Sequence, residues 1–177
     1  MTRRANPAGH ARAATWQNAS FSGIVRAEKM LDLTIFRQLA EELIPFNKWL
    51  GVKVEHLARG HVTLSIPWRE ELIGDPIRQA LHGGLISTLA DTAGGLCVWT
   101  EIENPSLSRV STVDLRVDYL RPGRREMLVG DATTVRVGAK LGWADVRLYH
   151  PSAASELVAT ARGVYALKTP KQPNRDA

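Results

Sequence analysis

The sequence of 177 residues has little of what would define several common classes of protein. It contains one cysteine, Cys97, which excludes an intrachain disulfide framework and suits a reducing compartment, so we expect a cytoplasmic protein. It has no run of 18 apolar residues, and we therefore expect no membrane partner. Its five histidines are dispersed, with no close cluster of Cys or carboxylates at ligand spacing, so we expect neither a metal site nor a cofactor.

The positive charge of the sequence lies at its start. Residues 1–29 hold five basic residues and one acidic residue, whereas residues 30–177 carry a net charge of only +1. Because non-specific nucleic-acid binding needs clustered positive charge, we expect no nucleic-acid partner. Residues 1–29 have no apolar segment typical of a secretory signal. We expect a disordered extension there, a domain over 30–169 and a flexible tail over 170–177. A transit peptide and a working start at Met30 remain alternatives for the extension.

Hydrophobic periodicity predicts one α+β domain, and 44% apolar residues are enough for its core. We expect a helix over 31–44 that Pro45 ends, strands over 49–58 and 61–68, and a loop over 69–81. Later strands, joined by short turns, predict an antiparallel meander. The first of these places Val113, Leu115, Val117 and Tyr119 on one face, and the others cover residues 127–137, 143–150 and 156–167.

The segment 82–100 predicts a buried helix, because its apolar residues cover most of the circumference. Asp91 lies inside this pattern, where a carboxylate is costly unless it is paired or used. Catalysis is one interpretation, and a structural carboxylate paired within the core is the other. Cys97 lies in the same pattern and is expected to be a core residue, since no base stands at local spacing.

Two glycine pairs mark this helix. Gly83 and Gly84 lie at its start, where backbone amides lack intrahelical partners and can hold a carbonyl oxygen that gains negative charge. Gly94 and Gly95 cost roughly 1 kcal/mol each relative to Ala in mid-helix. That cost is understandable if a sheet approaches this turn closely.

The spacing of His82 and Asp91 predicts a site shared between two chains. Nine residues separate them by about 13 Å along a helix and by about 180° around its axis. One helix therefore cannot direct its first amides and Asp91 at the same carbonyl. A homodimer could, with the Gly83 and Gly84 amides of one subunit facing the carboxylate of the other across a two-fold axis.

The stretches 81–96 and 110–122 together resemble the hotdog-fold acyl-CoA thioesterases, in particular the branch named for phenylacetyl-CoA thioesterase. The likeness covers roughly residues 31–168. It implies a long central helix wrapped by an antiparallel sheet of about six strands, dimers that pair into tetramers, and hydrolysis of an acyl-CoA. In this family the carboxylate matching Asp91 activates water or attacks directly. The amide matching Gly83 polarises the carbonyl, and a hydroxyl matching Thr112 often positions the water.

One departure from the family pattern concerns substrate binding. Family members often place an Asn shortly before the His-Gly-Gly sequence, whereas Asp75 and Pro76 stand near that place here. Asp75 can accept a hydrogen bond but cannot donate one while ionised. Gln79 is the only amide nearby and is shifted in register. We take Asp75 and Gln79 as candidate substrate-binding residues.

The remaining candidates each have a structural alternative. His82 can orient the helix start by hydrogen bonding or act as a base. Thr112 can serve the site or simply favour a strand. Arg121, Arg124 and Lys140 can be solvated turn charges, or they can bind the phosphates of CoA.

The sequence therefore predicts a thioester hydrolase in which Asp91 acts as general base or nucleophile and the Gly83 amide polarises the carbonyl. Two other classes stay open. One is a hotdog-fold hydratase or dehydratase acting on acyl thioesters, and the other is a non-catalytic acyl-CoA-binding protein. The acyl group is left open by the sequence.

Overall fold

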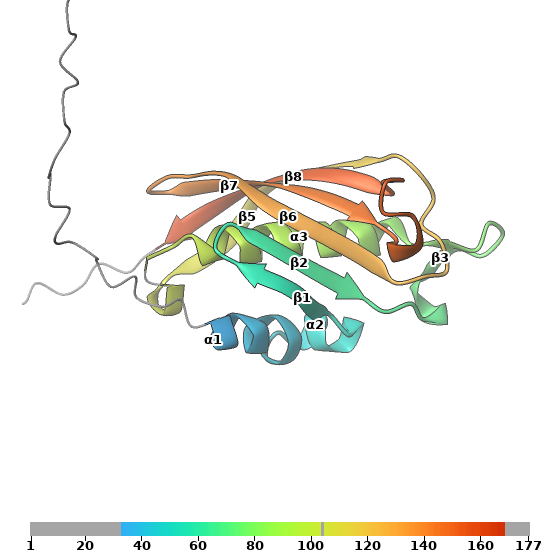
Figure 1. Cartoon of the computed structure of the whole chain (residues 1–177), viewed down its shortest axis with the longest axis horizontal. Helices are drawn as coiled ribbons and strands as arrows, with labels where there is room; N and C mark the ends of the chain where they lie inside the picture. Colours follow the sequence, from blue (N-terminus) through green and yellow to red (C-terminus); the bar gives the residue numbers. More distant parts are fainter. Residues whose placement is uncertain (1–32, 104, 169–177) are drawn as a thin grey trace, which may run out of the picture. The chain divides into compact units, whose positions relative to one another are not determined.

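A long helix, α3 (Gly83–Thr100), packs against one face of a six-stranded antiparallel sheet (Figure 1). The computed structural model describes residues 33–103 and 105–168. The expectations for residues 1–29 and 170–177 lie outside these ranges. The sheet confirms the expected α+β class and consists of β1 (Lys53–Ala58), β2 (His61–Ile66), β5 (Arg109–Tyr119), β6 (Leu128–Val137), β7 (Leu141–Tyr149) and β8 (Ala159–Lys168).

The sheet has the strand order β1-β2-β6-β7-β8-β5, which corrects the expected meander. β6, β7 and β8 do follow one another, but β5 pairs with β8 at the edge, and β6 pairs with β2. Turn residues fix where a chain reverses, whereas the side chains that strands bury together decide which distant strands pair. Beside β2, the buried Leu128 and Ala132 of β6 join Leu64 in the core.

The core lies between α3 and the sheet, as the apolar circumference of the helix predicts. Leu89, Ala90 and Ala93 are fully buried. Leu89 packs on Gly130 of β6, where a Cβ atom would lie 3.0 Å from the Leu89 Cγ. Burying one such leucine stabilises the fold by roughly 1.5–3 kcal/mol. Within the described residues no helix is long and apolar enough to cross a membrane.

The segment before the sheet differs from the expectation. The helical segment α1 (Leu33–Gln38) continues as a π-helical turn, η1 (Leu39–Leu43), but Pro45 begins a further helix, α2 (Pro45–Leu50), instead of ending one. Proline is accepted at the first position of a helix because the N–H it lacks would have no partner there. Gly51, with a φ of 75°, ends α2, so the first strand starts at Lys53 and not at residue 49.

The expected loop over 69–81 contains regular structure. A short 3-10 turn, η2 (Glu70–Leu72), leads into a two-stranded sheet of β3 (Ile73–Asp75) and β4 (Ala80–Leu81). The amide of Leu81 donates to the carbonyl of Gly123, and that of His82 donates to the carbonyl of Leu72, both at 2.9 Å. These bonds fix the direction in which the chain enters α3. Two further 3-10 turns are η3 (Pro105–Leu107) and η4 (Pro151–Ala153).

Cys97 is buried on α3, as expected for a core residue. Its Sγ lies 3.4 Å from the carbonyl oxygen of Ala132. Burial, followed by the charge of Glu101, raises the pKa of the Cys97 thiol to about 12. A thiol with such a pKa is no nucleophile at neutral pH.

Candidate active site

The side chain of His82 caps the start of α3. Its Nδ1 accepts a hydrogen bond of 2.8 Å from the amide of Gly84, two residues further on. This is the orienting role that the sequence left as one of two possibilities. It also occupies the Gly84 amide, which was a candidate for binding the substrate carbonyl. The Gly83 amide has no acceptor within the part of the chain that the structure describes, so of the two glycine amides it is the one that is not hydrogen-bonded.

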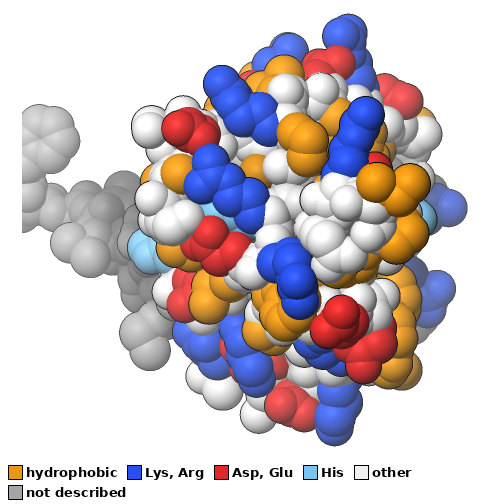
Figure 2. All heavy atoms as spheres, turned by 90° about the vertical axis from the view of Figure 1, so that its right-hand side faces the viewer, with side chains coloured by type: hydrophobic (Ala, Val, Ile, Leu, Met, Phe, Trp, Pro, Cys, Tyr) orange, Lys and Arg blue, Asp and Glu red, His pale blue; other side chains and the backbone are white. Residues whose placement is uncertain are grey.

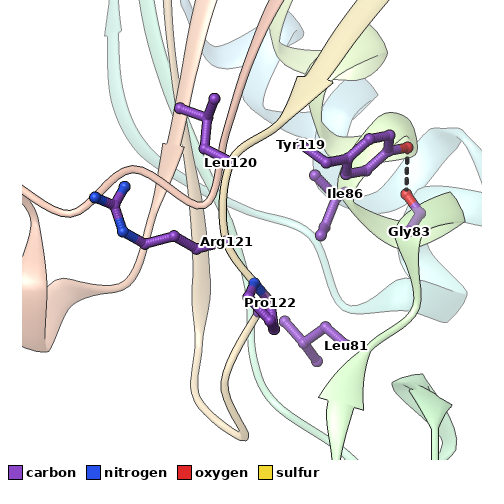
Figure 3. A pocket seen from close by; sticks show the side chains of 8 residues that line it. Leu81, Gly83, Ile86, Tyr119, Leu120, Arg121 and Pro122 are labelled. Carbon is purple, nitrogen blue, oxygen red and sulfur yellow. Dashed lines mark hydrogen bonds between the residues drawn. The ribbon is translucent and has the colours of Figure 1, made fainter. Parts of the chain in front are cut away.

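Gly83 lies at the wall of a shallow pocket of about 300 Å³ (Figure 3). The hydroxyl of Tyr119, on β5, donates to the carbonyl of Gly83 at 3.1 Å. That hydroxyl also lies 2.5 Å from the Oγ of Ser87, which therefore donates to Tyr119. The alternation of residues in the sequence predicts Tyr119 only as part of an apolar face and gives no indication of the hydrogen bonds that its hydroxyl forms. The pocket is lined by Leu81, Gly83, Ile86, Tyr119, Leu120, Arg121, Pro122 and Gly123.

Asp91 is half-buried on α3 and is held by a hydroxyl group. The Oγ1 of Thr112, on β5, donates to the Oδ1 of Asp91 at 2.7 Å. Among the described residues, no Lys, Arg or His forms a salt bridge with this carboxylate. Of the structural alternative, a carboxylate capped or salt-bridged inside the core, the described residues show no salt bridge, whereas Thr112 supplies a hydrogen-bonding partner.

A β-bulge turns Thr112 toward Asp91. In the pairing of β5 with β8, Thr112 lies opposite Tyr165 and Asp114 lies opposite Val164, so Val113 is an extra residue. The bulge places Thr112 on the helix-facing side together with Leu115, Val117 and Tyr119. Val113, expected on that same face, is 61% exposed. Strict alternation would have put Thr112 on the opposite face.

The side chains of Asp75 and Gln79 form hydrogen bonds with backbone groups of the turn in which they lie. Asp75 Oδ1 accepts from the amides of Ile77 and Arg78, both at 3.0 Å. Gln79 has a φ of 56°, and its Nε2 donates to the carbonyl of Pro76 at 2.6 Å. Both side chains thus hold the connection between β3 and β4.

The candidate phosphate ligands do not converge within one chain. Arg121 donates to the carbonyl of Leu157 at 3.0 Å, and its side chain points away from Tyr119 and Gly83 (Figure 3). Arg124 pairs with Glu156 at 2.7 Å. Lys140 follows the other end of β6, a strand of ten residues that spans about 33 Å. Figure 2 shows Lys and Arg side chains scattered among acidic ones on the face toward the β3–β4 sheet, and not gathered into one basic patch.

The structure does not bring Gly83 and Asp91 together within one chain. They lie eight residues apart on α3, which is about 12 Å along its axis. Gly83 contacts Tyr119, near the end of β5, and Asp91 contacts Thr112, near its start. Among the residues described, no group of three or more His, Cys, Asp or Glu could hold a metal ion.

A helix packed against an antiparallel sheet, with an unbonded Gly83 amide at its start and the Asp91 carboxylate near its middle, is the arrangement of the hotdog-fold thioester enzymes. A family model described as the thioesterase superfamily matches residues 79–155. The medium/long-chain acyl-CoA thioesterase YigI of Escherichia coli is 33% identical over 140 residues, covering 73% of this chain and 89% of YigI. The Halobacterium salinarum protein VNG_1336C is 40% identical over 122 residues, covering 66% of this chain and 80% of that protein.

Solved structures agree with this likeness. A Shewanella oneidensis protein related to the thioesterase superfamily superposes with a TM-score of 0.68 at 27% identity, covering 76% of this chain and 94% of that one. The PaaI protein of the Escherichia coli phenylacetic acid degradation operon shares the fold, with a TM-score of 0.59 at 22% identity over 67% of this chain and 80% of that chain. The chain belongs to the thioesterase superfamily. The expectations of a hotdog fold and of a thioester hydrolase are thereby confirmed.

Proposed function

We propose that the protein hydrolyses an acyl-CoA thioester to the free acid and CoA, with Asp91 as the reacting carboxylate. The observation that carries the proposal is the Asp91 side chain itself. It is half-buried on a helix that has no other charged residue, and the described partner of the carboxylate is one hydroxyl group instead of a cation. A carboxylate held in this way remains free to take a proton from water or to attack a carbonyl carbon.

The free edge of β5 supports a site built from two chains. β5 lies at the edge of the sheet with β8 as its single neighbour, so a second β5 can pair with it antiparallel. Because Val113 is bulged out, Thr112 and Tyr119 lie three ladder positions on either side of Arg116. A two-fold axis near Arg116 would place Gly83 and Tyr119 of one chain beside Asp91 of the partner subunit. Dimerisation then brings together the two groups that one helix holds apart.

In such a site each group has a distinct role. The Gly83 amide donates to the thioester carbonyl and stabilises the negative charge that develops on its oxygen. Asp91 of the partner subunit either takes a proton from the attacking water or attacks the carbonyl carbon itself, and the mixed anhydride is then hydrolysed. In both routes the C–S bond breaks and CoA leaves as a thiol. Thr112 orients the carboxylate.

The substrate class follows YigI by analogy, so medium- and long-chain acyl-CoA thioesters are the first to test. The apolar side chains Leu81, Ile86 and Leu120 beside Gly83 support an aliphatic group at the pocket. We also propose that two dimers pair into a homotetramer and that the protein is located in the cytoplasm.

Binding without turnover is the second candidate, and one observation favours it. In the turn that precedes His82, the Gln79 amide donates to the carbonyl of Pro76 and Asp75 accepts from two backbone amides, so both side chains already have partners within the turn. Near the position where family members often carry an Asn that orients substrate or water, this chain has Asp75 and Pro76. Tight acyl-CoA binding with no release of thiol would establish this alternative.

The test is release of free thiol from a panel of acyl-CoA substrates by the wild-type protein and by Asp91→Asn. The Asn side chain keeps an oxygen that can accept from Thr112, so the fold is preserved. We expect turnover to fall about 100-fold or more, as is usual when a general base is removed. Near-normal hydrolysis by Asp91→Asn would refute the proposal. Hydration of an enoyl-CoA without thiol release would assign the protein to the hydratases.

A further inference from the structure

The side chain of Tyr165 occupies a slot between β8 and α3 that three glycines leave open. Tyr165 is 1% exposed. A Cβ atom on Gly94 or on Gly163 would collide with its hydroxyl, and one on Gly95 would lie 3.3 Å from its ring. This close approach is what the mid-helix glycine pair led us to expect. Glycine at positions 94 and 95 lowers the intrinsic stability of the helix relative to alanine, but it leaves the space that the phenol group of Tyr165 occupies.

The hydroxyl of Tyr165 binds the main chain of the residue that carries the reacting carboxylate. It donates to the carbonyl oxygen of Asp91 at 3.3 Å. In an α-helix the same carbonyl accepts from the amide four residues on, which here is that of Gly95. Tyr165 thus adds a bond from the sheet to a helical turn that Gly94 and Gly95 make intrinsically weak.

Thr112 and Tyr165 bind two different groups of Asp91. They are direct neighbours across the pairing of β5 with β8. Thr112 binds the carboxylate, and Tyr165 binds the carbonyl of the same residue. Burial, followed by the charge of Asp91, raises the pKa of the Tyr165 hydroxyl, so the phenol keeps its proton and remains a donor throughout the working range of pH.

We propose that Tyr165 is the positioning residue that fixes the backbone of Asp91 for reaction with the substrate held by the partner subunit. The inference rests on the function proposed above. Tyr165 lies beneath the helix and acts through Asp91 without touching substrate. Its hydroxyl should therefore affect the rate of turnover and leave substrate binding unchanged.

The first test is Tyr165→Phe, which keeps the ring and removes the hydroxyl. We expect kcat to fall about tenfold with KM within about twofold of wild type, because a small misplacement of a reacting group costs rate and not affinity. Tyr149→Phe is the matched control, since it removes a phenol hydroxyl from β7, and it should leave both constants unchanged. Folding of each variant is checked by thermal unfolding and by its size in solution.

Gly94→Ala breaks the same bond from the other side. Its methyl group displaces the hydroxyl from Asp91 while Tyr165 is intact, so the same selective loss of kcat is expected. A kcat within twofold of wild type in Tyr165→Phe would overturn the inference. So would equal changes of kcat and KM, or loss of the fold in both variants. If Asp91→Asn is inactive in the same assays, any of these outcomes contradicts only the proposed role of Tyr165 and leaves the proposed function intact. Activity of Asp91→Asn removes the proposed function itself.

Discussion

The hydroxyl of Thr112 lies 2.7 Å from the carboxylate of Asp91 and joins the edge strand β5 to the middle of α3. A hydrogen bond to an ionised group is worth roughly 1.5–3 kcal/mol. Thr112→Val keeps the shape and the strand preference but removes this bond, so we expect kcat to fall about tenfold and the free energy of unfolding to fall by no more than roughly 1.5–3 kcal/mol. Thr112→Ser keeps the hydroxyl and should recover most of the rate. A normal rate in Thr112→Val together with a low rate in Thr112→Ser would show that the methyl group, and not the bond, is what matters.

Gly83→Pro removes the backbone N–H that we propose donates to the thioester carbonyl, and it leaves the other backbone amides of the helix start in place. Gly83 is the first residue of α3, where proline is well accepted, and His82 has a ψ of 131°, which suits a residue before proline. We expect kcat/KM to fall about 100-fold, the usual cost of losing one such donor. Gly83→Ala retains the N–H, and its Cβ would lie 3.5 Å from Tyr119. The rate of the Pro variant relative to the Ala variant therefore measures the donor alone.

Hybrid dimers test whether the site is shared. Asp91→Asn and Gly83→Pro, each inactive alone, are expressed together with different affinity tags, and the mixed species is purified through both tags. If each site takes Gly83 from one chain and Asp91 from the other, one of its two sites is intact, so we expect about half of the wild-type activity per dimer. Hybrids as inactive as their parents would place both groups in one chain.

Asp145 and Arg162 form a two-point ion pair between β7 and β8, with N–O distances of 2.6 and 2.7 Å. The hydrogen bonds from Arg162 lower the pKa of the Asp145 carboxyl in the folded state. A lowered pKa stabilises the fold above the unfolded-state pKa, near 4, and this contribution is lost as pH falls through the folded-state value. We expect Asp145→Asn to lower the free energy of unfolding at pH 7 by less than about 1 kcal/mol, because both side chains are exposed.

Urea unfolding of both proteins at pH 7 and at pH 3 checks this prediction. The difference between wild type and Asp145→Asn should shrink at the lower pH. A difference that stays constant would mean that the pair contributes through its shape and not through its charge.

The sequence by itself determined the central helix and most of the strands. The apolar circumference of residues 82–100 requires burial, and the pair Gly94–Gly95 marks a close approach of the sheet at mid-helix. The alternation of apolar and polar residues located the strands, because successive side chains of a strand point to opposite faces of the sheet and only one of these faces is buried. Local patterns gave the wrong result at Pro45, since a proline that ends one helix can equally begin another.

Only the tertiary structure decided which residues meet Asp91. The bulge at Val113 shifts the phase of β5 and turns Thr112 inward, and no local residue pattern indicates it. The pairing of β5 with β8 places Tyr165 beside Thr112, although 53 residues separate them in the sequence. Contacts between distant strands depend on how whole side-chain layers pack against the helix, and a single sequence read in short windows carries no information about that packing.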